Sequence, residues 1–320
     1  MEIYKQRYLI TGGAGFIGSH IAEHLSQNNA FVIVLDNLVT GNIKNIQHLQ
    51  NILFVKGDIN DSELLKDLLP QIDVIIHLAA LGSVNRSIEK PMDTHLANST
   101  GFLNILYWAK EYNIKGVIYA SSSSVYGDDS HLPKKEEYIG NPLSPYAVSK
   151  LSNELYAKVF WQLFQLPVIG LRYFNVFGPR QNPYGPYAAA IPIFIEKMLN
   201  QESIYIHGSG EQKRDFTYVE NVVNANLAAI QSILNNNTKA FGDVFNIGCH
   251  QSISINQVFE ILAKKLNYIH APVYTEPRKG DIFASLADIS KAQEILGYKP
   301  TVFFEEGIER TVRYFMSNIT

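Results

Sequence analysis

Residues 9–25 read LITGGAGFIGSHIAEHL and carry glycines at positions 12, 15 and 18, between a short apolar run and a longer amphipathic one. Their spacing is GxxGxxG, and they lie at the first predicted turn from a strand into a helix. Glycines let a backbone turn tightly and approach a pyrophosphate, whose charge is stabilised at the helix N-terminus. The stretch predicts a dinucleotide-binding turn, although three glycines alone would also suit an ordinary turn.

Short apolar runs alternate with amphipathic ones through the first half of the chain. Short apolar strands that are separated by helices are typical of a parallel sheet buried on both faces. The fold class is therefore α/β, a doubly wound parallel sheet of the Rossmann type. We expect strands at 8–11, 31–36, 52–58, 74–80, 117–122 and 167–174, and helices near 16–28, 61–69, 94–112 and 145–165.

The texture of the sequence changes after residue 175, where a segment rich in Pro, Gly and Tyr begins. Such a segment does not form a long regular element. We expect a dinucleotide-binding domain over 1–175, rejoined by a strand near 244–248. A smaller mixed lobe over 176–320 then binds the substrate.

Composition excludes several classes of function. The 320 residues are 46% hydrophobic and 18% charged with a net charge of −3, which argues against a nucleic-acid or membrane partner because both need a basic face. No run approaches the roughly 18 apolar residues that span a membrane.

Cys249 is the one cysteine and lies in an apolar stretch, which predicts a buried thiol and fits a cytoplasmic location. No metal-ligand spacing is present, so we expect no metal.

The ends of the predicted strands indicate which dinucleotide binds. Asp36 closes the second strand, where an acidic side chain accepts hydrogen bonds from the adenosine ribose and repels a 2′-phosphate, so we expect NAD rather than NADP. Asp58 closes the third strand and is expected at the adenine. Ala79 and Ala80 suit close cofactor approach, but would equally suit a core. The remaining residues expected at the cofactor are Phe16, Ile17, Asn37, Ile59, Leu78, Asn98, Lys150, Tyr146 and Tyr173.

A tyrosine and a lysine lie four residues apart in SPYAVSK, residues 144–150. On a helix Tyr146 and Lys150 share one face. A neighbouring ammonium and a positive nicotinamide ring would lower the pKa of the phenol from its usual value near 10, giving a general base. Such pairs also occur by chance. Here the pair follows a serine run, 121–124, at the carboxyl edge of the sheet, where ligands of such sheets bind.

The segments TGGAGFIGSH, SSSSVYG, SPYAVSK and LRYFNVFGPRQ together resemble the extended short-chain dehydrogenase/reductase family, and specifically its nucleotide-sugar 4-epimerases. The resemblance runs from about residue 7 to past 300. It implies that Ser122, or next Ser123, is the hydroxyl partner of Tyr146. It also implies that Tyr146 takes the proton of a sugar 4-hydroxyl while hydride passes to tightly held NAD+. The 4-keto sugar then turns and takes the hydride back on its other face.

The same resemblance implies a UDP-sugar substrate. It assigns the diphosphate to Arg214 and Arg278 and the uracil to Tyr205. Asn175 is assigned to the phosphate and sugar. Three further positions are expected to line the uridine and sugar pocket: Ala189, Ala190 and Ile191.

Small residues near the sugar indicate which hexose is preferred. Gly82, which Ser83 follows, stands where epimerases of plain UDP-hexoses often have a lysine, and Ser285 stands where they often have a tyrosine, so this pocket resembles the branch that prefers N-acetylated substrates. A small residue leaves room for an N-acetyl group. We expect interconversion of UDP-N-acetylglucosamine and UDP-N-acetylgalactosamine. UDP-glucose, UDP-galactose and the uronic forms of the acetylated sugars stay open, since Arg86 could meet a carboxylate.

Two other classes of function stay open as well. One is a UDP-sugar decarboxylase or reductase, and the other is a non-catalytic NAD-binding module, which has no reason to keep Tyr146, Lys150 and Ser122 together. The resemblance further implies a homodimer through a four-helix bundle of the helices near 94–112 and 145–165. The apolar residues noted on these helices are Phe102, Leu106, Trp108 and Leu155.

Overall fold

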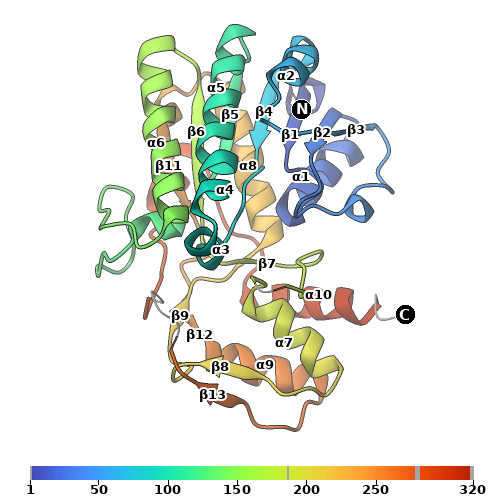
Figure 1. The fold of residues 1–320 in the computed structure, drawn as a ribbon, viewed down its shortest axis with the longest axis vertical. Coiled ribbons are helices and arrows are strands. Elements are labelled where there is room, and N and C mark those ends of the chain that lie inside the picture. Colours follow the sequence, from blue (N-terminus) through green and yellow to red (C-terminus); the bar gives the residue numbers. More distant parts are fainter. Residues whose placement is uncertain (1, 186, 278–281, 318–320) are drawn as a thin grey trace.

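A seven-stranded parallel sheet lies at the centre of the protein, in the order β11-β6-β5-β4-β1-β2-β3 (Figure 1). The computed structural model describes residues 2–185, 187–277 and 282–317. The order reverses at β1, which pairs with both β2 and β4, so a crevice is expected at their carboxyl ends. The α/β class is confirmed. The strands are β1 (Arg7–Thr11), β2 (Phe31–Asp36), β3 (Ile52–Lys56), β4 (Val74–His77), β5 (Gly116–Ser122), β6 (Val168–Tyr173) and β11 (Asp243–Ile247).

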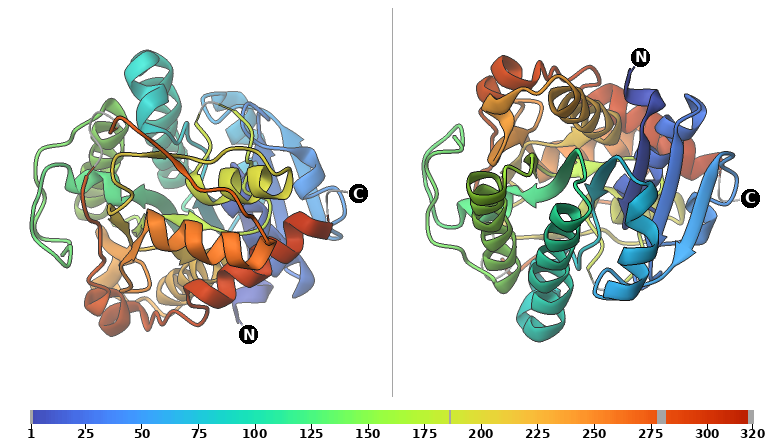
Figure 2. Two further views of the ribbon diagram at one scale, coloured as in Figure 1. Left: turned by 90° about the horizontal axis from the view of Figure 1, so that it is seen from below. Right: turned by 90° about the horizontal axis from the view of Figure 1, so that it is seen from above.

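Helices cover both faces of this sheet (Figure 2). Successive side chains of a strand point to opposite faces, and β1 illustrates the result. Tyr8 and Ile10 pack in the core with α1 (Phe16–Gln27) and α8 (Val219–Leu234). Leu9 packs in a second core, which is formed with α2 (Ser62–Leu68), α5 (Gly101–Glu111) and α6 (Pro145–Phe164).

The helix expected over 94–112 is divided. It consists of α4 (Pro91–His95), a π-helical turn at Leu96–Thr100 (η4) and α5, and a short helix α3 (Val84–Glu89) precedes it. Phe102 and Leu106 of α5 are fully buried inside the chain, so the suggestion that they face a partner is wrong. Leu155 of α6 is 61% exposed.

A second group of elements lies below the sheet in Figure 1 and has its own apolar core, which includes Phe177, Ile195 and Phe304. Because α8 and β11 return to the sheet, the chain passes between the two parts more than once, and the division at residue 175 stays a prediction. The elements of the lower part are β7 (Val176–Phe177), α7 (Ala190–Leu199), β8 (Tyr205–His207), β9 (Lys213–Arg214), β10 (Thr217–Tyr218), β12 (Ile253–Ser254), α9 (Ile255–Leu266), β13 (Val273–Thr275) and α10 (Phe304–Ser317).

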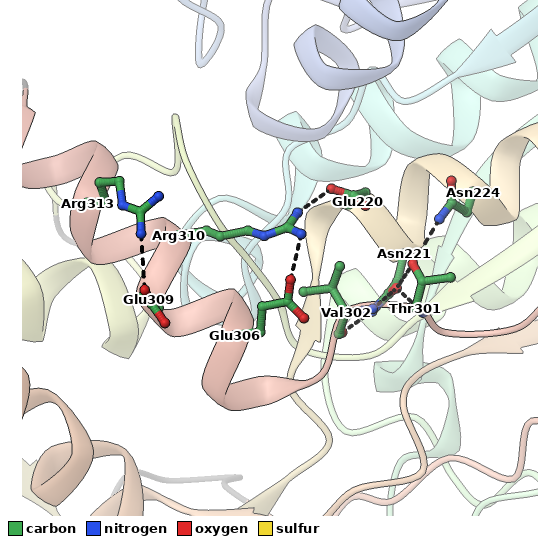
Figure 3. A network of polar contacts seen from close by, with 9 residues as sticks. All are labelled: Glu220, Asn221, Asn224, Thr301, Val302, Glu306, Glu309, Arg310 and Arg313. Atoms are coloured by element: carbon green, nitrogen blue, oxygen red, sulfur yellow. Dashed lines mark hydrogen bonds and ion pairs between the residues drawn. The ribbon is translucent and has the colours of Figure 1, made fainter.

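A polar network joins α8 to the C-terminal segment (Figure 3). The side chain of Asn221 is fully buried; its oxygen accepts from the backbone N–H groups of Thr301 and Val302 at 2.8 and 3.1 Å. Arg310 of α10 pairs with Glu220 at 2.7 Å, but both side chains are exposed. Buried hydrogen bonds therefore fix this junction more firmly than the ion pair does.

Two smaller sequence expectations also meet the structure. Cys249 is free and buried, which confirms the expected apolar thiol, and burial raises its pKa to about 12. Among the helices of the described ranges, none combines the length and apolar character that crossing a bilayer requires.

Candidate active site

A cleft of about 1080 Å³ lies at the carboxyl ends of β1, β2, β3 and β4. This is the place that the strand order predicts for a ligand. Its lining brings together many residues that the sequence suggested for the cofactor, along with one suggested for the substrate. They are Gly12, Gly15, Phe16, Ile17, Gly18, Asp36, Asn37, Asp58, Ile59, Leu78, Ala79, Ala80 and Gly82.

The three glycines of the turn have different structural roles. Gly12 has a φ of +70°, and a Cβ there would lie 2.6 Å from the backbone N of Ala79. A Cβ on Gly18 would lie 2.4 Å from the Gly12 carbonyl oxygen. A Cβ on Gly15, in contrast, would meet only that oxygen, at 3.2 Å. Gly12 and Gly18 are therefore required by packing, whereas Gly15 leaves its side of the turn open at the cleft.

The N-terminus of α1 supplies hydrogen-bond donors to this cleft. Gly15 caps the helix without a side chain, and Phe16, Ile17 and Gly18 form its first turn and line the cleft. The first N–H groups of a helix have no partner within the helix and attract negative charge. The glycine turn is thus suited to hold a phosphate group.

Asp36 is buried at the end of β2 and holds the turns on both sides of it. One carboxylate oxygen accepts from the backbone N of Ala14 at 3.0 Å, and the other accepts from that of Leu38 at 2.8 Å. Each oxygen can accept a further hydrogen bond, so Asp36 can still meet ribose hydroxyls. Close by, Asn37 donates to Asp58 at 2.8 Å, which helps to lower the pKa of that carboxyl against the effect of burial.

Two residues that were expected at the cofactor lie behind the cleft instead. The amide oxygen of Asn98 accepts from the backbone N of Leu81 at 2.8 Å, and its nitrogen donates to Ser149 at 3.1 Å. Asn98 therefore fixes the backbone at Leu81, a residue that lines the cleft. The hydroxyl of Tyr173, at the end of β6, accepts from Asn226 at 2.9 Å, and burial raises its pKa.

The serine run and the tyrosine–lysine pair meet where β5 packs against α6. Ser122 lies close enough to the Tyr146 hydroxyl to lower its pKa, and the Ser122 oxygen accepts from the backbone N–H of Ser124 at 3.1 Å. The Lys150 ammonium is buried, donates to the Ala120 carbonyl at 2.8 Å and lies 5.9 Å from the centre of the Tyr146 ring. Ala120 also lines the cleft, so this group adjoins it. Ser123 is half-buried and begins a short 3-10 helix, η5 (Ser123–Tyr126).

The protonation of the tyrosine differs from the sequence expectation. Burial raises the pKa of Tyr146, and Ser122 only partly opposes this. The Lys150 ammonium donates to the Ala120 carbonyl, and the lowering expected from Lys150 together with the nicotinamide ring stays a prediction. Burial lowers the pKa of Lys150 to about 8, and Glu154 opposes that shift.

The residues suggested for the substrate fall into separate groups. Ala189, Ala190 and Ile191 form the start of α7. Arg214 ends β9, and Ser285 is buried beside it, with its N–H donated to the Lys213 carbonyl at 3.0 Å. Asn175 is exposed after β6, and Tyr205 is half exposed on β8 with Lys197 over its ring. Ser83 caps α3, and Arg278 lies outside the described residues.

The loop after β7 contributes cleft residues that the sequence did not assign. Tyr187 lines the cleft, stacks under Arg86 at 4.9 Å and donates its hydroxyl to Glu89. Tyr184 also lines the cleft. The tyrosines of this Pro- and Gly-rich segment were the available signal, but nothing local shows that the loop returns to α3.

Comparison with known proteins identifies the family. A sequence model of the NAD dependent epimerase/dehydratase family matches residues 8–248. The chain belongs to this family. Its cofactor is NAD, which the open face of Gly15, the N–H groups of α1 and the carboxylate of Asp36 fit.

Three solved structures are closely similar. A UDP-glucose 4-epimerase of Thermotoga maritima with UDP-glucose is 39% identical (TM-score 0.93), covering 98% of this chain and 100% of that one. A UDP-N-acetylglucosamine 4-epimerase of Methanobrevibacter ruminantium M1, in complex with UDP-N-acetylmuramic acid, is 40% identical (TM-score 0.92), covering 98% of this chain and 99% of that one. A UDP-glucuronic acid 4-epimerase of Bacillus cereus with UDP-glucuronic acid and NAD is 34% identical (TM-score 0.87), covering 97% of this chain and 99% of that one.

Proposed function

We propose that the protein is a UDP-sugar 4-epimerase that interconverts UDP-N-acetylglucosamine and UDP-N-acetylgalactosamine. The observation that carries the reaction type is the grouping of Tyr146, Ser122 and the Lys150 ammonium beside the dinucleotide cleft. The similar 4-epimerases support the same reaction, and their substrates differ at nearly equal identity, so the choice of sugar rests on this chain's own residues.

The side chains divide the work of the reaction. Tyr146 accepts the proton of the sugar 4-hydroxyl as C4 is oxidised and returns it when C4 is reduced, so it acts as general base and then as general acid. Ser122 donates to the same oxygen and keeps it in line with Tyr146. When NAD is bound, it supplies the hydride acceptor and a positive ring charge. Lys150 adds a second positive charge, which favours the phenolate that burial alone disfavours.

We assign the cofactor and the sugar nucleotide to different groups of residues. We assign the NAD diphosphate to the N-terminus of α1 and its adenosine to the region of Asp36 and Asp58. Arg214 is assigned to the diphosphate of the sugar nucleotide. Since the sugar stays attached through its diphosphate, the 4-keto sugar can turn without leaving, and each face of C4 can meet the same Tyr146.

Two small residues support the N-acetylated substrate. A Cβ placed on Gly82 would have no atom within 4 Å, and Gly82 lines the cleft, so the space beside it is open. Ser285 is 3% exposed and held to Lys213 by its backbone. A tyrosine at 285 would have to displace neighbours or extend into the pocket, where an acetamido group would otherwise fit.

Substitution of Ser285 by tyrosine tests the choice of sugar. The kcat/KM for UDP-N-acetylglucosamine should fall at least tenfold in Ser285→Tyr, while that for UDP-glucose should stay level or rise. Ser285→Ala is the matched control and should keep the wild-type ratio. Equal losses for both sugars would contradict the proposed role of Ser285. Loss of CO2 from a uronic substrate, or stoichiometric consumption of cofactor, would favour the decarboxylase or reductase.

Tyr146→Phe separates an enzyme from a binding module. The variant should keep NAD, because its ring is unchanged, and should lose turnover by at least a thousandfold. Unchanged turnover would exclude Tyr146 as the base. No turnover by the wild-type chain on any UDP-sugar, with NAD bound, would favour the module.

The assembly and location are part of the same proposal. An exposed apolar strip runs along α6 through Val148, Leu155, Val159 and Leu163, with exposures of 54%, 61%, 43% and 69%. Strips of this size on one helix face favour pairing with another copy. We assign this strip to a homodimer through a four-helix bundle of α5 and α6, and we assign the protein to the cytoplasm.

A further inference from the structure

Three side chains of α6, spaced four residues apart, reach across to β5. Tyr146 lies beside Ser122, Lys150 donates to the Ala120 carbonyl, and Glu154 accepts from the Ser121 hydroxyl at 2.5 Å. Residues at i, i+4 and i+8 of a helix lie along one face, so the three contacts form a continuous seam. The first two carry the proposed reaction, but the third has no role in it.

Glu154 is held in place by a buried arginine. Arg172 of β6 is 1% exposed and binds Glu154 through two parallel bonds of 2.8 and 2.7 Å. Its remaining contacts are the Glu136 carbonyl at 3.2 Å and the face of the Tyr126 ring at 4.9 Å. A bidentate pair of this kind has a fixed geometry, so the carboxylate has one position relative to β5.

That position places a negative charge one helical turn below Lys150. The charged and titratable groups that face Lys150 are Glu154 and Tyr146 on α6 and His77 on β4, while β5 offers the Ala120 carbonyl. His77 is buried, bonds to Thr11 at 2.8 Å and is neutral, because burial and Lys150 lower its pKa to about 3. Glu154 is therefore the group that opposes the effect of burial on Lys150.

We propose that Glu154, clamped by Arg172, is a positioning residue for the epimerase reaction: it fixes Ser121 so that the adjacent Ser122 lies beside Tyr146, and it holds a carboxylate one helical turn from the Lys150 ammonium. The role in turnover rests on the proposed function above. The effect on Lys150 does not, because it is a property of the folded chain alone.

The test is Glu154→Gln, which keeps the shape and removes the charge. The 13Cε resonance of Lys150 in lysine-labelled holoenzyme, assigned with Lys150→Arg, reports its titration directly. The midpoint should fall by about one to two pH units, because a charge about 6 Å away is lost in a partly buried site. The alkaline limb of kcat should move down equally, and kcat at pH 8.5 should fall about tenfold or more. Glu111→Gln, which removes a surface carboxylate paired with Lys110, should change neither.

A double variant separates this role from folding. Glu154→Gln leaves Arg172 buried and unpaired and is expected to destabilise the chain, whereas Glu154→Gln with Arg172→Met removes both charges and should regain stability. The Lys150 midpoint of the double variant should stay below the wild-type value but above that of Glu154→Gln, because the positive charge of Arg172, which also lowers it, is gone. An unchanged midpoint in Glu154→Gln, or a return of midpoint and kcat to wild-type values in the double variant, would overturn the proposal. A lowered midpoint in a chain that converts no UDP-sugar would support the effect on Lys150 and refute the proposed function alone.

Discussion

Two alanine substitutions in the glycine turn should separate cofactor binding from folding. Gly12→Ala places a Cβ 2.6 Å from the Ala79 backbone at a φ of +70°. The left-handed conformation costs roughly 1–2 kcal/mol and the overlap roughly 1–3 kcal/mol, so stability should fall by about 2–5 kcal/mol. Gly15→Ala meets only the Gly12 oxygen, at 3.2 Å, and its φ of −75° suits any residue. Its stability should change by less than about 1 kcal/mol.

Gly15→Ala should weaken the binding of NAD although it hardly changes stability. Its added methyl group lies on the open side of the turn, where the diphosphate is expected, so NAD should bind at least tenfold more weakly, which is about 1.4 kcal/mol. Urea unfolding gives the stabilities, and calorimetric titration of cofactor-stripped protein gives the affinity. If Gly15→Ala bound NAD like the wild type, the diphosphate would not lie against this turn, and the orientation assigned to the cofactor would be wrong.

Three further perturbations follow from buried or exposed groups elsewhere. Asn221→Ala should cost about 2–4 kcal/mol in urea unfolding, because it leaves the backbone donors of Thr301 and buried Val302 without their acceptor, whereas Arg310→Ala should cost under about 1 kcal/mol; equal losses would contradict this. Burial raises the pKa of Asp215 to about 6, so its protonated form favours folding, and that contribution is present near pH 4 and lost as pH rises through 6. Asp215→Asn should flatten this part of the stability curve between pH 4 and 7, and an unchanged slope would refute it. Leu163→Glu should convert a dimer to a monomer in analytical ultracentrifugation, whereas Ile269→Glu, at an even more exposed apolar site on the lower part, should not.

The sequence predicted those parts of the fold and cleft that depend on local pattern. The turn at Gly12 to Gly18 and the helix that carries Tyr146 and Lys150 follow from spacing alone. Short apolar runs predicted that Asp36 and Asp58 lie at the carboxyl edge of the sheet, and both residues line the cleft there.

Long-range contacts account for what the sequence missed. Asn98 lies in a π-helical turn and directs its amide to the backbone of Leu81, a contact between residues 17 positions apart that the local pattern does not show. The sequence analysis did not single out Glu154 of α6, since its partner Arg172 lies on β6, 18 residues further along the chain. Spacing put Lys150 on the same helix face as Tyr146, but it could not show that the ammonium donates to a backbone carbonyl or that burial raises the pKa of Tyr146.

The central claim is that this chain epimerises an acetylated UDP-hexose with NAD that it already holds. The most direct measurement incubates purified protein, without added cofactor, separately with UDP-N-acetylglucosamine and UDP-glucose and follows the sugar protons by NMR. The account predicts that UDP-N-acetylgalactosamine forms and that the plain sugar reacts much more slowly. Conversion of UDP-glucose alone would contradict the assigned substrate, and conversion of neither sugar by NAD-loaded protein would contradict the proposed activity.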